Sequence, residues 1–164
     1  MYCFQKDIAF QEVPNEVSLI LSISGCPARC VGCHSIDLWK DKNGVFLSEE
    51  LFLSYLKMYE GLLTCVCFFG GEWQKEQLIK LLRIARSHNL KTCLYSGEKG
   101  IPEDIEMHLT YLKLGPWIES LGGLESIHTN QRIMNLETGE VLNHYFWKTP
   151  HGGRDVEAYT GANQ

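Results

Sequence analysis

The chain has 164 residues, of which 45% are hydrophobic and 21% charged, and its formal net charge is −5. This balance is typical of one globular domain and excludes a disordered or fibrous chain. No run of lysine and arginine is long enough to follow a phosphate backbone, so we expect no nucleic-acid partner. The first twenty residues show no signal peptide, and no apolar run approaches the about 20 residues of a membrane span. We therefore expect a cytoplasmic protein without membrane contact.

Four short apolar runs along the chain each end in glycine and are typical of buried strands. They are EVSLILSISG (16–25), TCVCFFGG (64–71), KTCLYSG (91–97) and YLKLG (111–115). The carboxyl ends of parallel strands meet at one edge of a sheet, where α/β folds bind their ligands. Glycine lets a backbone approach a ligand closely, so the four glycines predict a shared binding rim. For any one of them, the simpler interpretation that glycine merely ends the strand stays open.

Helix-like segments lie between these runs, and the alternation of strand and helix predicts an α/β fold with a mostly parallel sheet. Ser48 is a suitable N-cap for the first helix. Its apolar face is predicted from residues three or four positions apart, namely Leu51, Tyr55, Met58 and Tyr59. The second helix shows such spacing at Leu78, Leu81, Leu82 and Ala85, with an end near Asn89. A third, shorter helix is expected from Pro102 through Leu109.

The C-terminal part of the chain has a different pattern. The segment QRIMNLETGEVLNHYFW (131–147) predicts a hairpin whose two strands are joined around Glu137, Thr138 and Gly139. The segment 148–164 has few apolar residues, and we expect it to be a mobile tail. The sequence thus predicts one domain over residues 1–147, followed by this tail.

The stretch SISGCPARCVGCHS (22–35) places Cys26, Cys30 and Cys33 within eight positions. The chain has seven cysteines, an odd number, and no export signal, so we expect reduced thiols rather than disulfides. Three of the others lie in apolar runs and are expected to pack as small hydrophobic residues: Cys65, Cys67 and Cys93.

Three interpretations of the clustered cysteines can be compared. Their spacing would place them on one face of a helix, as part of a core, but Gly25, Pro27 and Gly32 disfavour a helix and favour a loop. A loop can wrap its thiolates around zinc, which needs a fourth ligand such as His34. It can equally hold an iron–sulfur cluster, whose usual complement is four cysteines. With only three cysteine ligands, one iron of a four-iron cluster is left open for a ligand that binds and leaves.

The spacing Cys-x3-Cys-x2-Cys after the first strand, with FFGGE (68–72) ending the second, resembles the radical S-adenosylmethionine superfamily. The resemblance implies a [4Fe–4S] cluster whose open iron is chelated by S-adenosylmethionine. It implies that the cluster ligands are Cys26, Cys30 and Cys33. It also implies that the cofactor is positioned by residues of the two motifs, namely Gly32, Cys33, His34, Gly70, Gly71 and Glu72. Many members carry an aromatic residue where Gly32 stands, and His34 is expected to make the adenine contact instead.

Further motifs, LYSG (94–97), YLKLGPWIESLGGL (111–124) and TNQR (129–132), extend the resemblance over most of residues 10–135. Together they resemble the activating enzymes of anaerobic ribonucleotide reductase. A complete eight-fold barrel takes about 250 residues, so the shorter chain is expected to form an incomplete βα barrel with mostly parallel strands. Ser96 is a candidate contact for ribose or carboxylate, and Arg132 for a carboxylate. A plain turn at Ser96 and a structural role for Arg132 are the alternatives.

The resemblance implies the following chemistry. One electron from the cluster cleaves S-adenosylmethionine to methionine and a 5′-deoxyadenosyl radical, which generates a glycyl radical on the reductase large subunit. A low-potential electron donor such as flavodoxin is then a second partner, and no protein acid or base is required. The alternatives are another glycyl-radical enzyme or a small pterin-like substrate as the target, or a non-catalytic zinc-binding protein.

Overall fold

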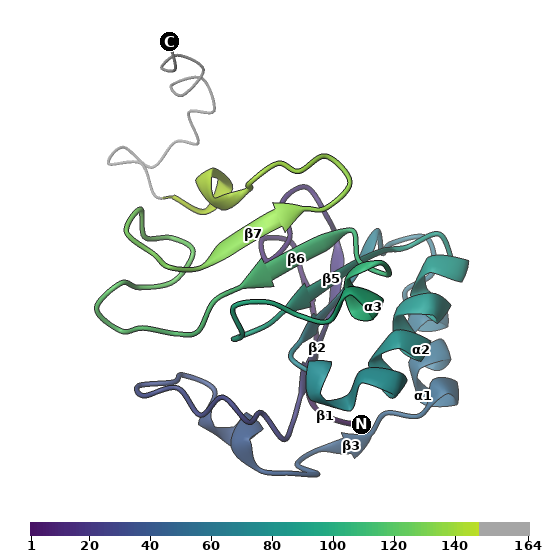
Figure 1. Ribbon diagram of the computed structural model, residues 1–164. Helices are drawn as coiled ribbons and strands as arrows, with labels where there is room; N and C mark the ends of the chain where they lie inside the picture. Colours follow the sequence, from purple (N-terminus) through teal and green to yellow (C-terminus); the bar gives the residue numbers. More distant parts are fainter. Residues whose placement is uncertain (148–164) are drawn as a thin grey trace.

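The computed structural model describes residues 1–147, and in this part seven strands form one open sheet (Figure 1). Across the sheet the order is β3-β1-β2-β4-β5-β6-β7. The strands are β1 (Tyr2–Ala9), β2 (Ser18–Ile23), β3 (Val45–Phe46), β4 (Cys65–Phe69), β5 (Lys91–Tyr95), β6 (Tyr111–Leu114) and β7 (Arg132–Asn135). Strands β2, β4, β5 and β6 run parallel, whereas β3 joins β1, β1 joins β2 and β7 joins β6 in antiparallel pairs. The architecture is therefore mixed α/β with a mostly parallel sheet that does not close.

The four strands expected from the glycine-terminated runs are confirmed as β2, β4, β5 and β6. Most of their side chains are buried, as continuous apolar runs predict for central parallel strands. The expectation from sequence did not include β1 or β3. In β1 only Cys3 is buried, so its sequence lacks the apolar run that marks the other strands.

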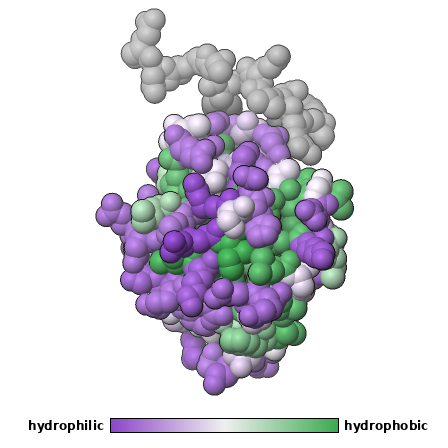
Figure 2. Space-filling model, turned by 90° about the vertical axis from the view of Figure 1, so that its right-hand side faces the viewer, coloured by the Kyte–Doolittle hydropathy of each residue, from purple (hydrophilic) through white to green (hydrophobic). Residues whose placement is uncertain are grey.

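Three helices lie on one side of the sheet in the described chain, α1 (Glu49–Met58), α2 (Lys75–Ser87) and α3 (Glu103–Glu106) (Figure 1). Ser48 is the N-cap of α1, as predicted, since its side chain accepts a hydrogen bond from the Leu51 amide at 3.2 Å. The predicted apolar face of α1 was partly wrong. Phe52 and Leu56 are its buried residues, whereas Met58 is 63% exposed. Figure 2 views the molecule from this side, where apolar areas lie among polar ones.

The second helix buries the predicted residues, which are Leu78, Leu81, Leu82 and Ala85. Asn89, just after α2, has a left-handed φ of 57°, a conformation that often ends helices. The predicted end of the helix near Asn89 is therefore confirmed. The third helix ends at Glu106, three residues before the predicted end at Leu109. Met107 and His108 form a turn, from which the chain leads into β6.

The sheet separates two hydrophobic cores. The core beneath the helices includes Leu21, Phe68 and Leu81. The opposite core is covered by loops, and its buried residues include the thiols predicted to be buried, Cys65, Cys67 and Cys93. These cysteines therefore pack as hydrophobic residues in the sheet, at a distance in sequence from the cysteine cluster of residues 26–33.

The predicted C-terminal hairpin is only partly formed. Strand β7 turns after Asn135 and returns through a single bridge between Met134 and Val141, and the expected second strand is replaced by a 3-10 helix, Asn143–Phe146. Asn143 explains the difference. Its side-chain oxygen accepts a hydrogen bond from the Ile133 amide at 3.0 Å, and its amide donates to the Gln131 carbonyl at 2.8 Å. One side chain thus occupies the ladder positions that a second strand would fill.

No helix within residues 1–147 is long and apolar enough to cross a membrane. The predicted mobile tail, residues 148–164, lies outside the described residues.

Candidate functional site

The predicted glycine rim is present at the edge of the sheet where β2, β4, β5 and β6 end. At the exits of β2, β4 and β6, Gly25, Gly70, Gly71 and Gly115 have left-handed φ values of 88°, 78°, 111° and 110°. Gly97, at the exit of β5, has an ordinary backbone conformation. Residues other than glycine rarely adopt the left-handed conformation, so the exits of β2, β4 and β6 depend on glycine. Backbone hydrogen bonds join neighbouring exits, since the Gly70 amide donates to the Tyr95 carbonyl at 2.9 Å.

The cysteine loop, defined here as residues 25–35, is irregular backbone and not a helix, which rules out the core-stripe interpretation. The amides of Gly25 and Cys26 both donate to the Leu38 carbonyl, at 2.7 and 2.8 Å, and close the loop at its base. The Cys33 amide donates to the Cys30 carbonyl at 3.1 Å and forms a turn at its far end. Left-handed φ values at Arg29 and Gly32 complete the path.

The three thiols of this loop are partly exposed, and none of the cysteines in the described chain forms a disulfide. Burial raises the pKa of Cys26, while hydrogen bonds from the amides of Ala28 and Arg29 lower it. The Ser35 amide donates to the sulfur of Cys33 at 3.3 Å. Amides directed at sulfur stabilise thiolate ligands and tune the potential of an iron–sulfur cluster. The donor set of the cysteine loop therefore fits such a cluster.

Within residues 1–147, no three His, Cys, Asp or Glu side chains are grouped for a single metal ion. A [4Fe–4S] cluster binds each of its thiolates to a different iron and does not require such a group.

Glu72 and Ser96 meet where β4 and β5 end. The Ser96 hydroxyl donates a hydrogen bond to Oε1 of Glu72 and accepts one from the Glu98 amide at 3.0 Å. Burial raises the pKa of Glu72. Its other oxygen, Oε2, is buried and has no hydrogen-bond partner among the described residues. A buried acceptor of this kind costs free energy unless a donor reaches it.

Lys113 on β6 is a buried cation that the sequence interpretation missed. It is 8% exposed, and its ammonium donates to the Gly115 carbonyl at 2.9 Å and lies 6.0 Å from the centre of the Tyr95 ring. Burial lowers its pKa to about 8, against the opposing effect of the acidic groups of Cys30 and Glu72. A single lysine in the apolar run YLKL was the signal in the sequence.

The loop between β6 and β7 contacts the cysteine loop. The rings of His34 and Trp117 have centroids 4.5 Å apart. A Cβ added to Gly32 would lie 3.6 Å from Nε1 of Trp117 and 3.3 Å from a carboxylate oxygen of Glu119. Nε1 of Trp117 is itself buried without a hydrogen-bond partner in the described chain. Gly32 and His34 therefore share one neighbour, the Trp117 indole.

The structure brings together most, but not all, of the predicted site residues. Ser96 meets Glu72, and Gly97 lies beside Ala28 of the cysteine loop, since a Cβ added to it would be 3.7 Å from the Ala28 methyl group. Arg132 is different. It is exposed on β7, in register with Leu114, and no hydrogen bond or ion pair joins it to the cysteine loop in the part of the chain described.

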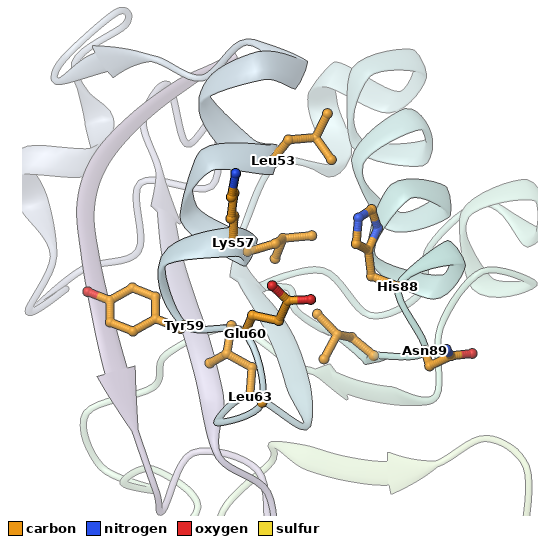
Figure 3. Close-up of a pocket in the computed structure, with 10 residues that line it drawn as sticks. Leu53, Lys57, Tyr59, Glu60, Leu63, His88 and Asn89 are labelled. Atoms are coloured by element: carbon orange, nitrogen blue, oxygen red, sulfur yellow. The ribbon is translucent and has the colours of Figure 1, made fainter.

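A pocket of about 510 Å³ lies between the C-terminal ends of α1 and α2 (Figure 3). Leu53, Lys57, Glu60 and His88 are among its lining residues. Its lining continues into residues just before β4 and β5, which is the edge of the sheet opposite to the strand exits. Its lining includes no cysteine, so this pocket is separate from the candidate site.

A comparison with protein families places the cysteine loop in a known context. The model of the family described as "4Fe-4S single cluster domain" matches residues 16–103, which include the loop and strands β2, β4 and β5. No curated protein and no solved structure matches the chain.

Proposed function

Because the chain belongs to the 4Fe-4S single cluster domain family, we propose that Cys26, Cys30 and Cys33 bind a [4Fe–4S] cluster with one iron left open. We propose further that S-adenosylmethionine binds this iron. The observation that carries the proposal is the cysteine loop itself, which offers three free, partly exposed thiols at the strand exits, with amides directed at two of the sulfurs. When bound, the reduced cluster supplies the electron that cleaves S-adenosylmethionine to methionine and a 5′-deoxyadenosyl radical.

The residues around the loop support this proposal by their unused hydrogen-bonding groups. Oε2 of Glu72 is a buried acceptor that suits the ammonium group of the methionine part. Gly70 and Gly71 have left-handed backbones without a Cβ, which lets the chain approach the ligand closely. Ser96 holds the Glu72 carboxyl in place through its hydroxyl.

The nucleoside end of the cofactor is assigned to the opposite side of the cysteine loop. His34 and Trp117 offer aromatic faces beside Gly32 and Cys33, and aromatic faces suit an adenine ring. Arg132 stays a candidate for a carboxylate contact, although within residues 1–147 no hydrogen bond or ion pair joins this exposed residue to the cysteine loop.

The proposed target is a glycine of the anaerobic ribonucleotide reductase large subunit. The deoxyadenosyl radical would take a hydrogen atom from the glycine Cα, giving 5′-deoxyadenosine and a glycyl radical. The motifs shared with the activating enzymes of that reductase support this target, and the open sheet is compatible with an incomplete βα barrel that admits a protein loop. Residues 1–147 would carry the activity, with electrons from a donor such as flavodoxin.

The experiment combines the anaerobically reconstituted protein, the purified large subunit, S-adenosylmethionine and a chemical reductant. We expect the doublet of a glycyl radical in the electron paramagnetic resonance spectrum, with 5′-deoxyadenosine formed in a matching amount. The Cys30→Ala variant is the control and should give neither product. Formation of 5′-deoxyadenosine without a glycyl doublet would retain the cleavage chemistry and reject this protein target.

A further inference from the structure

Lys113 is the buried charge of the candidate site whose role the proposed function leaves open. Its side chain extends from β6 toward the strand exits, where its ammonium reaches only the Gly115 carbonyl among the hydrogen bonds of the described chain. Within residues 1–147, salt bridges join other lysines to carboxylates, namely Lys75 to Asp104, Lys80 to Glu49 and Lys91 to Glu16. An ammonium has three donors, so the group is under-used for a cation that is more than nine-tenths buried.

A short series of contacts on both sides of Lys113 links its strand to the cysteine loop. Its carbonyl accepts a hydrogen bond from the Ser96 amide at 2.8 Å, and the next residue, Gly97, lies against Ala28 of the loop. On the other side, β6 continues into Trp117, which contacts His34 of the loop. The loop therefore contacts Gly97 after β5 and Trp117 after β6. Lys113 lies on β6, which is between these two residues in the sequence.

The electrostatic surroundings of Lys113 agree with this position. The acidic groups that act on its ammonium are the thiol of Cys30 and the carboxyl of Glu72. Cys30 is the middle cysteine of the loop, so a cluster bound there places its charge near the ammonium. Because burial removes water from around Lys113, this interaction is screened less than one at the surface.

We propose that the positive charge of Lys113 raises the reduction potential of the iron–sulfur cluster in the cysteine loop. Reduction adds one electron to the cluster, and a fixed cation nearby favours the reduced form. Net charge and burial around a cluster are among the factors that set its potential. The inference rests on the cluster of this family and not on S-adenosylmethionine cleavage or on the protein target.

The test is redox titration of the reconstituted protein without S-adenosylmethionine, followed by its visible and electron paramagnetic resonance spectra. We expect Lys113→Met to lower the equilibrium constant for one-electron reduction about tenfold, which corresponds to ~59 mV for a one-electron couple. Lys113→Arg, which keeps the charge, should leave the potential close to that of the unchanged protein. Lys99→Met is the matched control, because Lys99 follows β5 and is exposed to solvent.

A second neutral variant, Lys113→Gln, keeps a donor for the Gly115 carbonyl and separates the effect of charge from that of the hydrogen bond. An equal fall in Lys113→Gln and Lys113→Met supports the proposal. An unchanged potential in either, or an equal fall in Lys113→Arg, would overturn it. Loss of the cluster from both neutral variants would assign Lys113 to holding the loop and would also overturn it. A shifted potential without S-adenosylmethionine cleavage would reject the proposed function alone.

Discussion

The imidazole of His34 packs against the indole of Trp117, with ring centroids 4.5 Å apart and ring planes inclined by 50°. This contact joins the cysteine loop to the segment after β6, which lies beyond the residues 16–103 matched by the family. The same indole lies beside Gly32. A residue outside the family match therefore contacts the cysteine loop at two of its residues.

Trp117→Ala should loosen the cysteine loop. An aromatic pair contributes about 0.5–1.5 kcal/mol, so we expect hydrogen exchange at the bonded amides of Cys26 and Cys33 to accelerate by about two- to tenfold. Trp117→Phe keeps an aromatic face and should change the exchange rates little. Equal protection of both amides in Trp117→Ala and the unchanged protein would show that the indole does not hold the loop.

Gly70→Ala should destabilise the protein more than Gly61→Ala, although both glycines have a φ of 78°. The left-handed backbone costs any L-residue about 1–2 kcal/mol at each position. At Gly70 an added Cβ would also lie 2.9 Å from Cζ3 of the Trp73 ring, whereas at Gly61 it would meet nothing within 4 Å. The overlap adds about 1–3 kcal/mol. Urea unfolding measures both variants, and equal losses would show that the Trp73 ring moves aside freely.

Thiol labelling of the cluster-free, reduced protein should separate two groups of cysteines. We expect fast reaction at the three partly exposed thiols, Cys26, Cys30 and Cys33, and slow reaction at the four buried ones, Cys3, Cys65, Cys67 and Cys93. Burial raises the pKa of each of the four buried thiols, which lowers the thiolate fraction as well as the access. Mass spectrometry of the labelled native protein locates the sites. Early labelling of Cys67 or Cys93 would be incompatible with the loop-covered core.

Cys30→Ala should remove the cluster and leave the fold intact. The reconstituted protein should contain about four irons with sulfide, as a [4Fe–4S] cluster requires, and the variant should contain neither. Cys93→Ala, which truncates a buried thiol of the sheet, is the control and should keep its iron. Full iron in Cys30→Ala would disprove the assignment of the ligands, and one zinc in a colourless protein would favour the zinc-binding alternative.

The free energy of unfolding should reveal the cost of burying Lys113. Burial lowers its pKa from 10.5 to about 8, so the unfolded chain binds more protons between these values and the folded state gains stability as pH rises. In cluster-free protein, the stability of the unchanged protein relative to Lys113→Met should therefore rise from pH 7 to pH 10.5. The full change is about 3 kcal/mol, from 1.36 kcal/mol per unit of pKa. A difference that stays constant with pH would show that Lys113 is solvated in the folded protein.

Much of the fold and the centre of the site could be predicted from the sequence, because local patterns determine them. The glycine-terminated apolar runs predicted β2, β4, β5 and β6, and Gly25, Pro27 and Gly32 predicted a loop at the cysteines. The family match supports an iron–sulfur cluster, as the spacing of these cysteines suggested.

The features that were missed depend on contacts between distant residues. The second hairpin strand is absent because the Asn143 side chain bonds to Gln131 and Ile133, which no periodicity reveals. The run YLKL alone gives Lys113 no role, and only the folded sheet places its ammonium 6.0 Å from the centre of the Tyr95 ring. Trp117 is far from the cysteines in the sequence, and only the folded chain brings it to His34.

The most direct measurement is the electron paramagnetic resonance spectrum of the reduced, reconstituted protein, recorded before and after addition of S-adenosylmethionine. If three cysteines leave one iron open to the cofactor, the spectrum changes on addition and free methionine appears in solution. An unaltered spectrum with no methionine would mean that the cluster has no open position for this ligand, and the proposed chemistry would be wrong.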